Sequence, residues 1–168
     1  LIEQWSKEGY NVRTEFQAAL DAKAYREACQ LVTAAPPAAM AGLLPDAEDP
    51  RLLGCLPVAV GRVMEGVPEL RRAMQEEFGA LGRLRLKQAT ASGDESAVEA
   101  IAVQFCGSEG ATEATRWLGD RRLANGRFAQ AAGYYRRALR RASEAQRDAL
   151  SDRLRLSPRA SVTTQNVH

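Results

Sequence analysis

Apolar residues recur along this chain at intervals of three and four positions, the period of a helix that buries one face. Within residues 11–22, Val12, Phe16, Ala19 and Leu20 form such a stripe. Alternation of apolar and polar residues, which is typical of strands, is nearly absent. Further helical patterns cover residues 25–34, 49–66, 68 to about 92, 97–105, 112–124, 128–142 and 143–154. We therefore predict an all-α chain with about seven or eight helices.

Proline residues divide these patterns. Pro36 and Pro37 end the second helix, because proline lacks a backbone N–H and disfavours helix in the residue before it. We expect residues 36–50 to form a connector of small residues. Pro57 lies within an apolar stretch, where we expect it to kink or split a helix, and Pro68 suits the first position of the long helix that follows.

Two glycines interrupt the long helix, Gly79 and Gly82, and each costs about 1 kcal/mol relative to alanine. Close approach of another helix would explain them, and a hinge is the alternative. The stripe predicted to be buried in this helix comprises Leu70, Ala73, Met74, Phe78, Leu81 and Ala89.

The last two long patterns form a helix pair joined by Asn125-Gly126, a dipeptide suited to the left-handed backbone after a helix. On the second helix of the pair, seven apolar residues share one face: Phe128, Ala131, Ala132, Tyr135, Ala138, Leu139 and Ala142. The Arg ridge, made of Arg136, Arg137, Arg140 and Arg141, lies on the opposite face. We expect this helix to pack through Tyr135 against Leu118, with Arg137 and Arg141 exposed.

This pair resembles a tetratricopeptide repeat, a helix–turn–helix unit of about 34 residues. The matching positions are Leu118, Gly119, Gly126, Phe128, Ala131, Tyr135, Ala138 and Leu139. Arg122 stands where an aromatic residue is usual, and Ser143 where proline is usual, which fits a terminal or isolated unit. The resemblance implies antiparallel helix pairs stacked as a short right-handed superhelix. We predict one helical-repeat domain over residues 1–156, with the clear unit at 112–143 and a polar tail or linker at 157–168.

Residues 84–139 are also similar to helical segments of large bacterial pyrroloquinoline-quinone-type β-propeller repeat proteins, which are often exported. This resemblance implies that the chain is a helical module of a longer scaffold. It implies export or a periplasmic location, whereas a cytoplasmic location is expected without it. It places no quinone in these residues, because no propeller blade is present.

The charge and composition of the chain limit the classes of ligand that it is expected to bind. The 168 residues carry a net charge of +2, which does not by itself favour nucleic acid or an anionic membrane. The basic residues are 20 Arg and 3 Lys, and residues 112–159 hold 12 Arg against 5 acidic residues. An Arg-rich ridge over residues 116–159 is therefore the alternative signal, for a nucleic-acid backbone or another anionic surface.

The residues needed for common catalytic and metal sites are missing from the pattern. Cys29, Cys55 and Cys106 are far apart and lack metal-site spacing, so we expect small buried residues, with one disulfide as the alternative. The single histidine is His168. No phosphate-binding loop or nucleophile motif is present. We predict a non-catalytic chain that binds no metal and no organic cofactor.

The leading hypothesis is a scaffold module that binds a protein or peptide segment, or neighbouring domains of the same polypeptide. The repeat resemblance places five residues in the groove of the unit, namely Glu113, Arg116, Asp120, Leu123 and Ala124. Asp120 replaces the asparagine that helps such repeats grip a terminal carboxylate, so no carboxylate clamp is expected there. Nucleic acid is the less favoured partner, and no segment is expected to cross a membrane.

Overall fold

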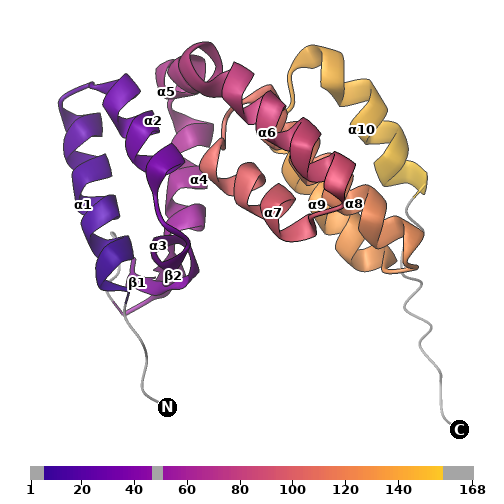
Figure 1. The fold of residues 1–168 in the computed structure, drawn as a ribbon, viewed down its shortest axis with the longest axis horizontal. Helices are drawn as coiled ribbons and strands as arrows, with labels where there is room; N and C mark the ends of the chain where they lie inside the picture. Colours follow the sequence, from indigo (N-terminus) through magenta and orange to yellow (C-terminus); the bar gives the residue numbers. More distant parts are fainter. Residues whose placement is uncertain (1–5, 47–50, 157–168) are drawn as a thin grey trace, which may run out of the picture.

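The computed structural model describes residues 6–46 and 51–156, and in these residues the chain is all-α (Figure 1), which confirms the predicted fold class. The helices are α1 (Lys7–Asp21), α2 (Tyr25–Ala34), α3 (Pro37–Ala41), α4 (Leu56–Gly66), α5 (Pro68–Ala73), α6 (Gly79–Ser92), α7 (Glu95–Gln104), α8 (Glu109–Ala124), α9 (Phe128–Arg141) and α10 (Glu144–Leu156). A π-helical turn, η1 (Met74–Phe78), joins α5 to α6 in one continuous run, and a small hairpin pairs β1 (Leu43–Pro45) with β2 (Leu53–Cys55). The predicted tail at 157–168 lies outside the described residues.

Side-chain caps and left-handed glycines set the ends of several helices. The side chains of Ser6, Asp94 and Ser108 accept hydrogen bonds from first-turn N–H groups of α1, α7 and α8, which have no partner within the helix. Gly93 follows α6 and Gly126 follows α8 with φ near +70°, a conformation that glycine adopts without a Cβ penalty. Local sequence therefore determines where these helices begin and end.

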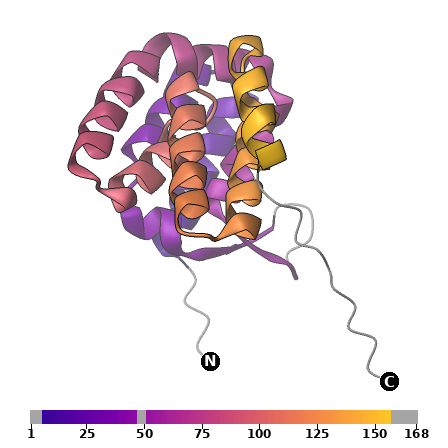
Figure 2. The ribbon, with the colours of Figure 1, turned by 90° about the vertical axis from the view of Figure 1, so that its right-hand side faces the viewer.

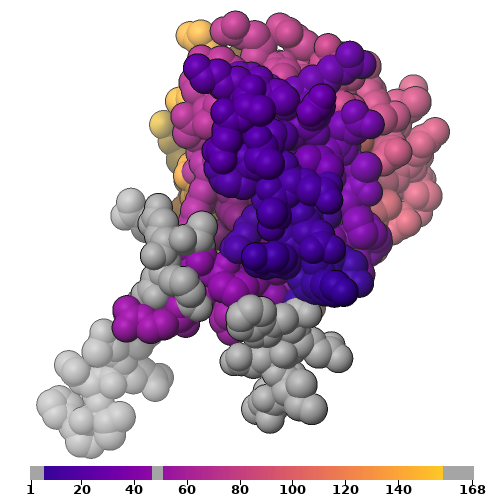
Figure 3. All heavy atoms as spheres, turned by 90° about the vertical axis from the view of Figure 1, so that its left-hand side faces the viewer, coloured from indigo at the N-terminus to yellow at the C-terminus, as the bar shows by residue number. Residues whose placement is uncertain are grey.

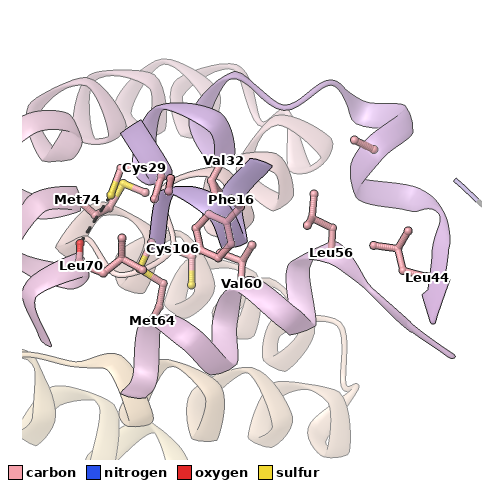
Figure 4. Packing of buried hydrophobic residues seen from close by; sticks show 13 residues of the cluster. Phe16, Cys29, Val32, Leu44, Leu56, Val60, Met64, Leu70, Met74 and Cys106 are labelled. Atoms are coloured by element: carbon pink, nitrogen blue, oxygen red, sulfur yellow. Dashed lines mark hydrogen bonds between the residues drawn. The ribbon is translucent and has the colours of Figure 1, made fainter. Parts of the chain in front are cut away.

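The N-terminal half packs α1 and α2 as an antiparallel pair against α4 and α5. Figure 3 shows α1 and α2 covering this end of the molecule. Their shared core contains Phe16, Val32, Val60 and Met64, each at most 3% exposed, and is seen from close by in Figure 4. Cys106 comes from the C-terminal half and is buried in this same cluster. One cluster thus contacts both halves of the chain.

The C-terminal half stacks α6, α7, α8, α9 and α10 in succession, as the side view in Figure 2 shows. Tyr135 and Leu118 are both buried, as expected, but they belong to different apolar clusters. The α8 residues that Tyr135 meets include Gly119 and Asp120. Gly119 faces the Tyr135 ring so closely that a Cβ at this position would lie 2.6 Å from its Cε1 atom. Only glycine, which has no Cβ, fits here without a shift of the ring where α8 and α9 cross.

The long run from α5 to α6 departs from the predicted stripe because of η1. A π-helical turn contains an extra residue, so it rotates the following helix relative to an uninterrupted one. After Phe78 the inward positions are Gly82, Leu86 and Ala89, whereas Leu81 is 41% exposed. The assignment of Leu81 to the core was therefore wrong.

Other expectations for this region have mixed outcomes. The close approach predicted at Gly82 is present, since a Cβ there would lie 3.0 Å from the Phe105 ring. Gly79 instead faces the side chain of Gln75 in the same helical run. The predicted kink at Pro57 is wrong, because Pro57 lies in the first turn of α4, where its missing N–H needs no partner. The connector at 36–50 contains α3 and β1, and residues 47–50 lie outside the described range.

Candidate interaction cleft

The predicted groove residues of the repeat unit contact each other and α10. Asp120 accepts hydrogen bonds from the Tyr135 hydroxyl at 2.8 Å, from Arg153 Nε at 3.0 Å and from Arg116 Nη1 at 2.6 Å. Glu113 accepts from Arg116 at 2.8 Å and from the Gln146 amide at 3.3 Å. Arg153 and Gln146 both belong to α10. These charged groups therefore connect α8 to α10.

The remaining two groove positions differ in their surroundings. Leu123 packs against the apolar cluster that includes Leu150 of α10, and Ala124 is exposed at the end of α8. The face that the repeat resemblance assigned to a groove is thus largely covered by α10. Glu113 and Arg116 also border a shallow depression beside Trp117.

Arg122 has a clear role at the position where the repeat pattern expects an aromatic residue. Its guanidinium forms ion pairs with Glu95 and Glu99 of α7, and its side chain is only 15% exposed. The hydrogen bond to Glu95 raises the pKa of Arg122, which favours the charged form of the guanidinium. Arg122 therefore connects α8 to the preceding helix through an ion pair.

The Arg ridge is not a uniformly solvated face. Arg136 and Arg137 are exposed, and the guanidinium of Arg137 lies 5.3 Å from the centre of the Tyr134 ring. Arg140 Nε lies 3.5 Å and Arg141 Nε lies 3.2 Å from the same carboxylate oxygen of Glu65 in α4. The expectation that Arg141 is exposed was wrong, since its side chain is 17% exposed.

Arg141 is largely covered because α4 presents a glycine to it. A Cβ at Gly61 would lie 2.5 Å from Nη2 of Arg141, so the guanidinium rests directly on the α4 backbone. Glycine leaves the space that this flat group needs. Gly61 and Glu65 lie one helical turn apart, so together they hold the Arg141 side chain against α4.

A cleft of about 670 Å³ opens between α4 on one side and α7, α8 and α9 on the other. We call it the α4–α9 cleft. Its charged lining residues are Arg62, Glu65, Glu99, Arg137, Arg140 and Arg141. Its other lining residues are Cys55, Pro57, Val58, Ala102, Val103, Cys106, Thr115, Leu118 and Tyr134. Three members of the predicted Arg ridge therefore line one cavity, together with residues that the sequence did not indicate.

The cleft has an excess of positive charge. Four arginines line it against two glutamates, and Glu65 is shared by Arg140 and Arg141. Glu99 lies 3.5 Å from Arg122, and Arg62 pairs with Asp46 at 3.1 Å. Arg137 forms no ion pair with any residue that the structure describes. An incoming anionic group would meet guanidinium groups with donors to spare.

One wall of the cleft is apolar. Pro57 and Val58 at the start of α4 line it, and Val58 is 49% exposed. The neighbouring hairpin leaves Leu52 and Leu53 exposed as well, at 59% and 38%. Exposed apolar residues that adjoin charged ones are typical of interaction surfaces.

Two thiols line this cleft, those of Cys55 and Cys106, and the buried one is a poor nucleophile. Burial raises the pKa of Cys106 above its ordinary value, so the thiol stays protonated at neutral pH. All three cysteines are free, with Cys29 and Cys106 buried and Cys55 half-buried. Among residues 6–46 and 51–156, no three potential ligands of the Cys, His, Asp and Glu types gather as a metal site.

Sequence reasoning missed the residues of α4 that complete the site. Glu65 and Arg141 are separated by 76 positions, and no local pattern links them. The glycine at position 61 was the one available signal, because glycine within a helix implies close approach of another group.

Comparison of the chain with protein-family models, with curated proteins and with solved structures found no match. In the part of the chain that the structure describes, none of the helices has the length and apolar composition needed to cross a bilayer.

Proposed function

We propose that this chain is a non-catalytic helical module that binds a segment of another protein, or of a neighbouring domain, in the α4–α9 cleft. The observation that carries the proposal is the composition of the cleft. It combines an apolar wall at Pro57 and Val58 with arginines that are incompletely neutralised. Protein segments offer both kinds of group, and arginine is enriched where proteins meet.

The resemblance of residues 112–143 to a tetratricopeptide repeat supports the same proposal. Stacked helix pairs hold binding surfaces in a fixed geometry. Binding of a segment therefore costs little conformational entropy in the module. The binding surface proposed here differs from the groove that the resemblance implied, because α10 contacts Glu113, Asp120 and Leu123.

A nucleic-acid-binding module is the second candidate, carried by the excess of arginine in residues 116–159. Two observations weigh against it. Arg140 and Arg141 are directed to Glu65 rather than forming an open basic surface, and the net charge is only +2. Recognition of a phosphate backbone relies on many such contacts and weakens steeply with salt.

The test is a selection of displayed random peptides on the immobilised chain, followed by titration calorimetry of the selected peptides. Val58→Asp introduces a charge into the apolar wall, and we expect it to weaken binding by about tenfold or more, as for truncation of an interface anchor. Leu84→Asp is the matched control, because Leu84 is similarly exposed, at 54%, on α6 and does not line the cleft.

Peptides that bind the parent chain and the Leu84→Asp variant, but not the Val58→Asp variant, would support the proposal. A selection that yields no peptide, or peptides indifferent to Val58→Asp, would contradict it. Titration with a single-stranded oligothymidylate at two salt concentrations tests the second candidate, since binding to phosphate would fall steeply as salt rises.

A further inference from the structure

Building on the proposed function, we infer that the α4–α9 cleft binds a segment with acidic and apolar side chains, and that Glu65 is an internal competitor for its arginines. Four residues that line the cleft carry both roles: Glu65, Arg137, Arg140 and Arg141.

The first observation is that one carboxylate oxygen serves two guanidinium groups. Glu65 Oε1 lies 3.2 Å from Arg141 Nε and 3.5 Å from Arg140 Nε. A guanidinium has five N–H donors and pairs best with both oxygens of a carboxylate. The contact at Arg140 is long, and its side chain is 58% exposed, so Arg140 is free to take a second carboxylate.

The second observation is the position of Arg137, one helical turn before Arg141 on α9. Its guanidinium lies over the Tyr134 ring at 5.3 Å, and it has no ion pair with a described residue. The ring holds the charge at the mouth of the cleft, because a cation is attracted to the face of an aromatic ring. Arg137 and Arg140 are three residues apart on α9, so both can contact one acidic segment.

The third observation is the apolar wall opposite these charges. A peptide that carries an acidic side chain can also carry apolar side chains next to it, and these can cover Pro57 and Val58. A phosphate backbone has no apolar groups at the corresponding spacing and would leave Val58 exposed. The combination therefore favours an acidic, partly apolar peptide over a nucleic acid.

Glu65 competes because it already occupies the position of a ligand carboxylate. Replacement of Glu65 by glutamine removes its charge and keeps its size, which leaves Arg140 and Arg141 without their internal partner. Glu69 is an exposed glutamate on α5 outside the cleft and serves as the matched control. Arg155, an exposed arginine of α10 paired with Asp152, is the control for the cleft arginines.

The experiment uses two pools of short fluorescent peptides, composed of Ala, Ser, Leu and Glu in random order, with Gln replacing every Glu in the second pool. Binding to the full chain is followed by fluorescence anisotropy. We expect the acidic pool to bind about tenfold more tightly, the value of one charge-assisted hydrogen bond. Arg137→Gln combined with Arg140→Gln should remove this preference, and Arg155→Gln should preserve it.

The competitor role has its own readout. Glu65→Gln should strengthen binding of the acidic pool by about threefold, the scale of a partly exposed ion pair, and leave the Gln pool unchanged. Glu69→Gln should change neither. Weaker acidic binding in Glu65→Gln would overturn the competitor role.

The possible failures are distinguishable. Equal binding of both pools in a manner that depends on Val58 would overturn this inference and leave the proposed function intact. Binding of neither pool would overturn this inference, and the peptide selection then decides the proposed function separately. Tighter binding of oligothymidylate than of either pool would overturn both and favour an anionic-surface function. Circular dichroism of each variant establishes that the fold is retained.

Discussion

Gly119 and Gly133 lie on the two helices of one pair and have opposite surroundings. A Cβ at Gly119 would lie 2.6 Å from the buried Tyr135 ring, whereas a Cβ at Gly133 would meet no atom within 4 Å. We expect Gly119→Ala to destabilise the chain by about 1–3 kcal/mol, because the ring cannot move without breaking its packing. We expect Gly133→Ala to stabilise it by about 0.5–1 kcal/mol, because alanine is favoured within a helix. Urea unfolding measures both, and a shift of both in the same direction would contradict this prediction.

The cysteines provide a second prediction at the scale of single residues. Burial, with a smaller contribution from Glu77, raises the pKa of Cys29 to about 12, and burial also raises the pKa of Cys106. Since only the thiolate reacts, both should stay unmodified by a thiol reagent at about pH 8. Cys55 is half-buried and free, so it should react first. Mass spectrometry of the labelled chain should show one modification, and rapid labelling of Cys29 would show that the apolar cluster of the N-terminal half opens readily.

At the residue scale, sequence reasoning identified contacts within a helix pair better than contacts between distant helices. The small residue at 119 and the buried Tyr135 follow from helical periodicity and from the repeat resemblance. The burial of Arg141 could not be predicted, because it depends on Gly61 and Glu65 of a helix far away in the sequence.

At the scale of elements, the two faces of α9 lead to a prediction about the α8–α9 pair. Leu118 of α8 is 1% exposed, in the apolar cluster that contains Val98 and Phe105, whereas Arg137 of α9 is exposed and stacked on Tyr134. Leu118→Ala should cost about 2–5 kcal/mol through lost burial and the cavity that remains. Arg137→Ala should change the free energy of unfolding by no more than about 0.5 kcal/mol. A larger loss for the arginine variant in urea unfolding would mean that the faces of α9 are assigned incorrectly.

Element bounds were predictable where strong local signals exist. Residues 25–34 form α2 as predicted, because Pro36 and Pro37 leave little freedom in where it ends. The hairpin of β1 and β2 was missed, since each strand has only three residues and no alternating pattern. The contact of α10 with α8 was also missed, because it depends on Gln146 and Arg153 reaching across to carboxylates on another helix.

At the scale of the whole molecule, the two halves are joined by contacts that should make them unfold together. Cys106 packs in the N-terminal cluster, and Phe78 contacts both that cluster and the one centred on Phe105. The Gln104 side chain donates a hydrogen bond to the carbonyl of Ala35 at 3.2 Å. The relative placement of the halves follows from these contacts and could not be derived from helical periodicity.

We therefore predict a single cooperative unfolding transition. Trp5→Phe leaves Trp117 of α8 as the only tryptophan, so fluorescence then reports the C-terminal half alone. The urea midpoint from this fluorescence should equal the midpoint from circular dichroism, which reports all helices. A dichroism curve with two steps, only one of which coincides with the fluorescence, would show that the halves unfold independently.

The π-helical turn has a consequence for chain length. Each residue of an α-helix advances the helix by about 100°, so removal of one residue from η1 would turn α6 through about that angle. Gly82 and Ala89 would then leave the interface with α7 and α8. We expect deletion of the exposed Glu76 to lower the melting temperature sharply, whereas Glu76→Ala should change it little. In this segment the number of residues matters more than their identity, and a one-residue deletion would be selected against even at an exposed position.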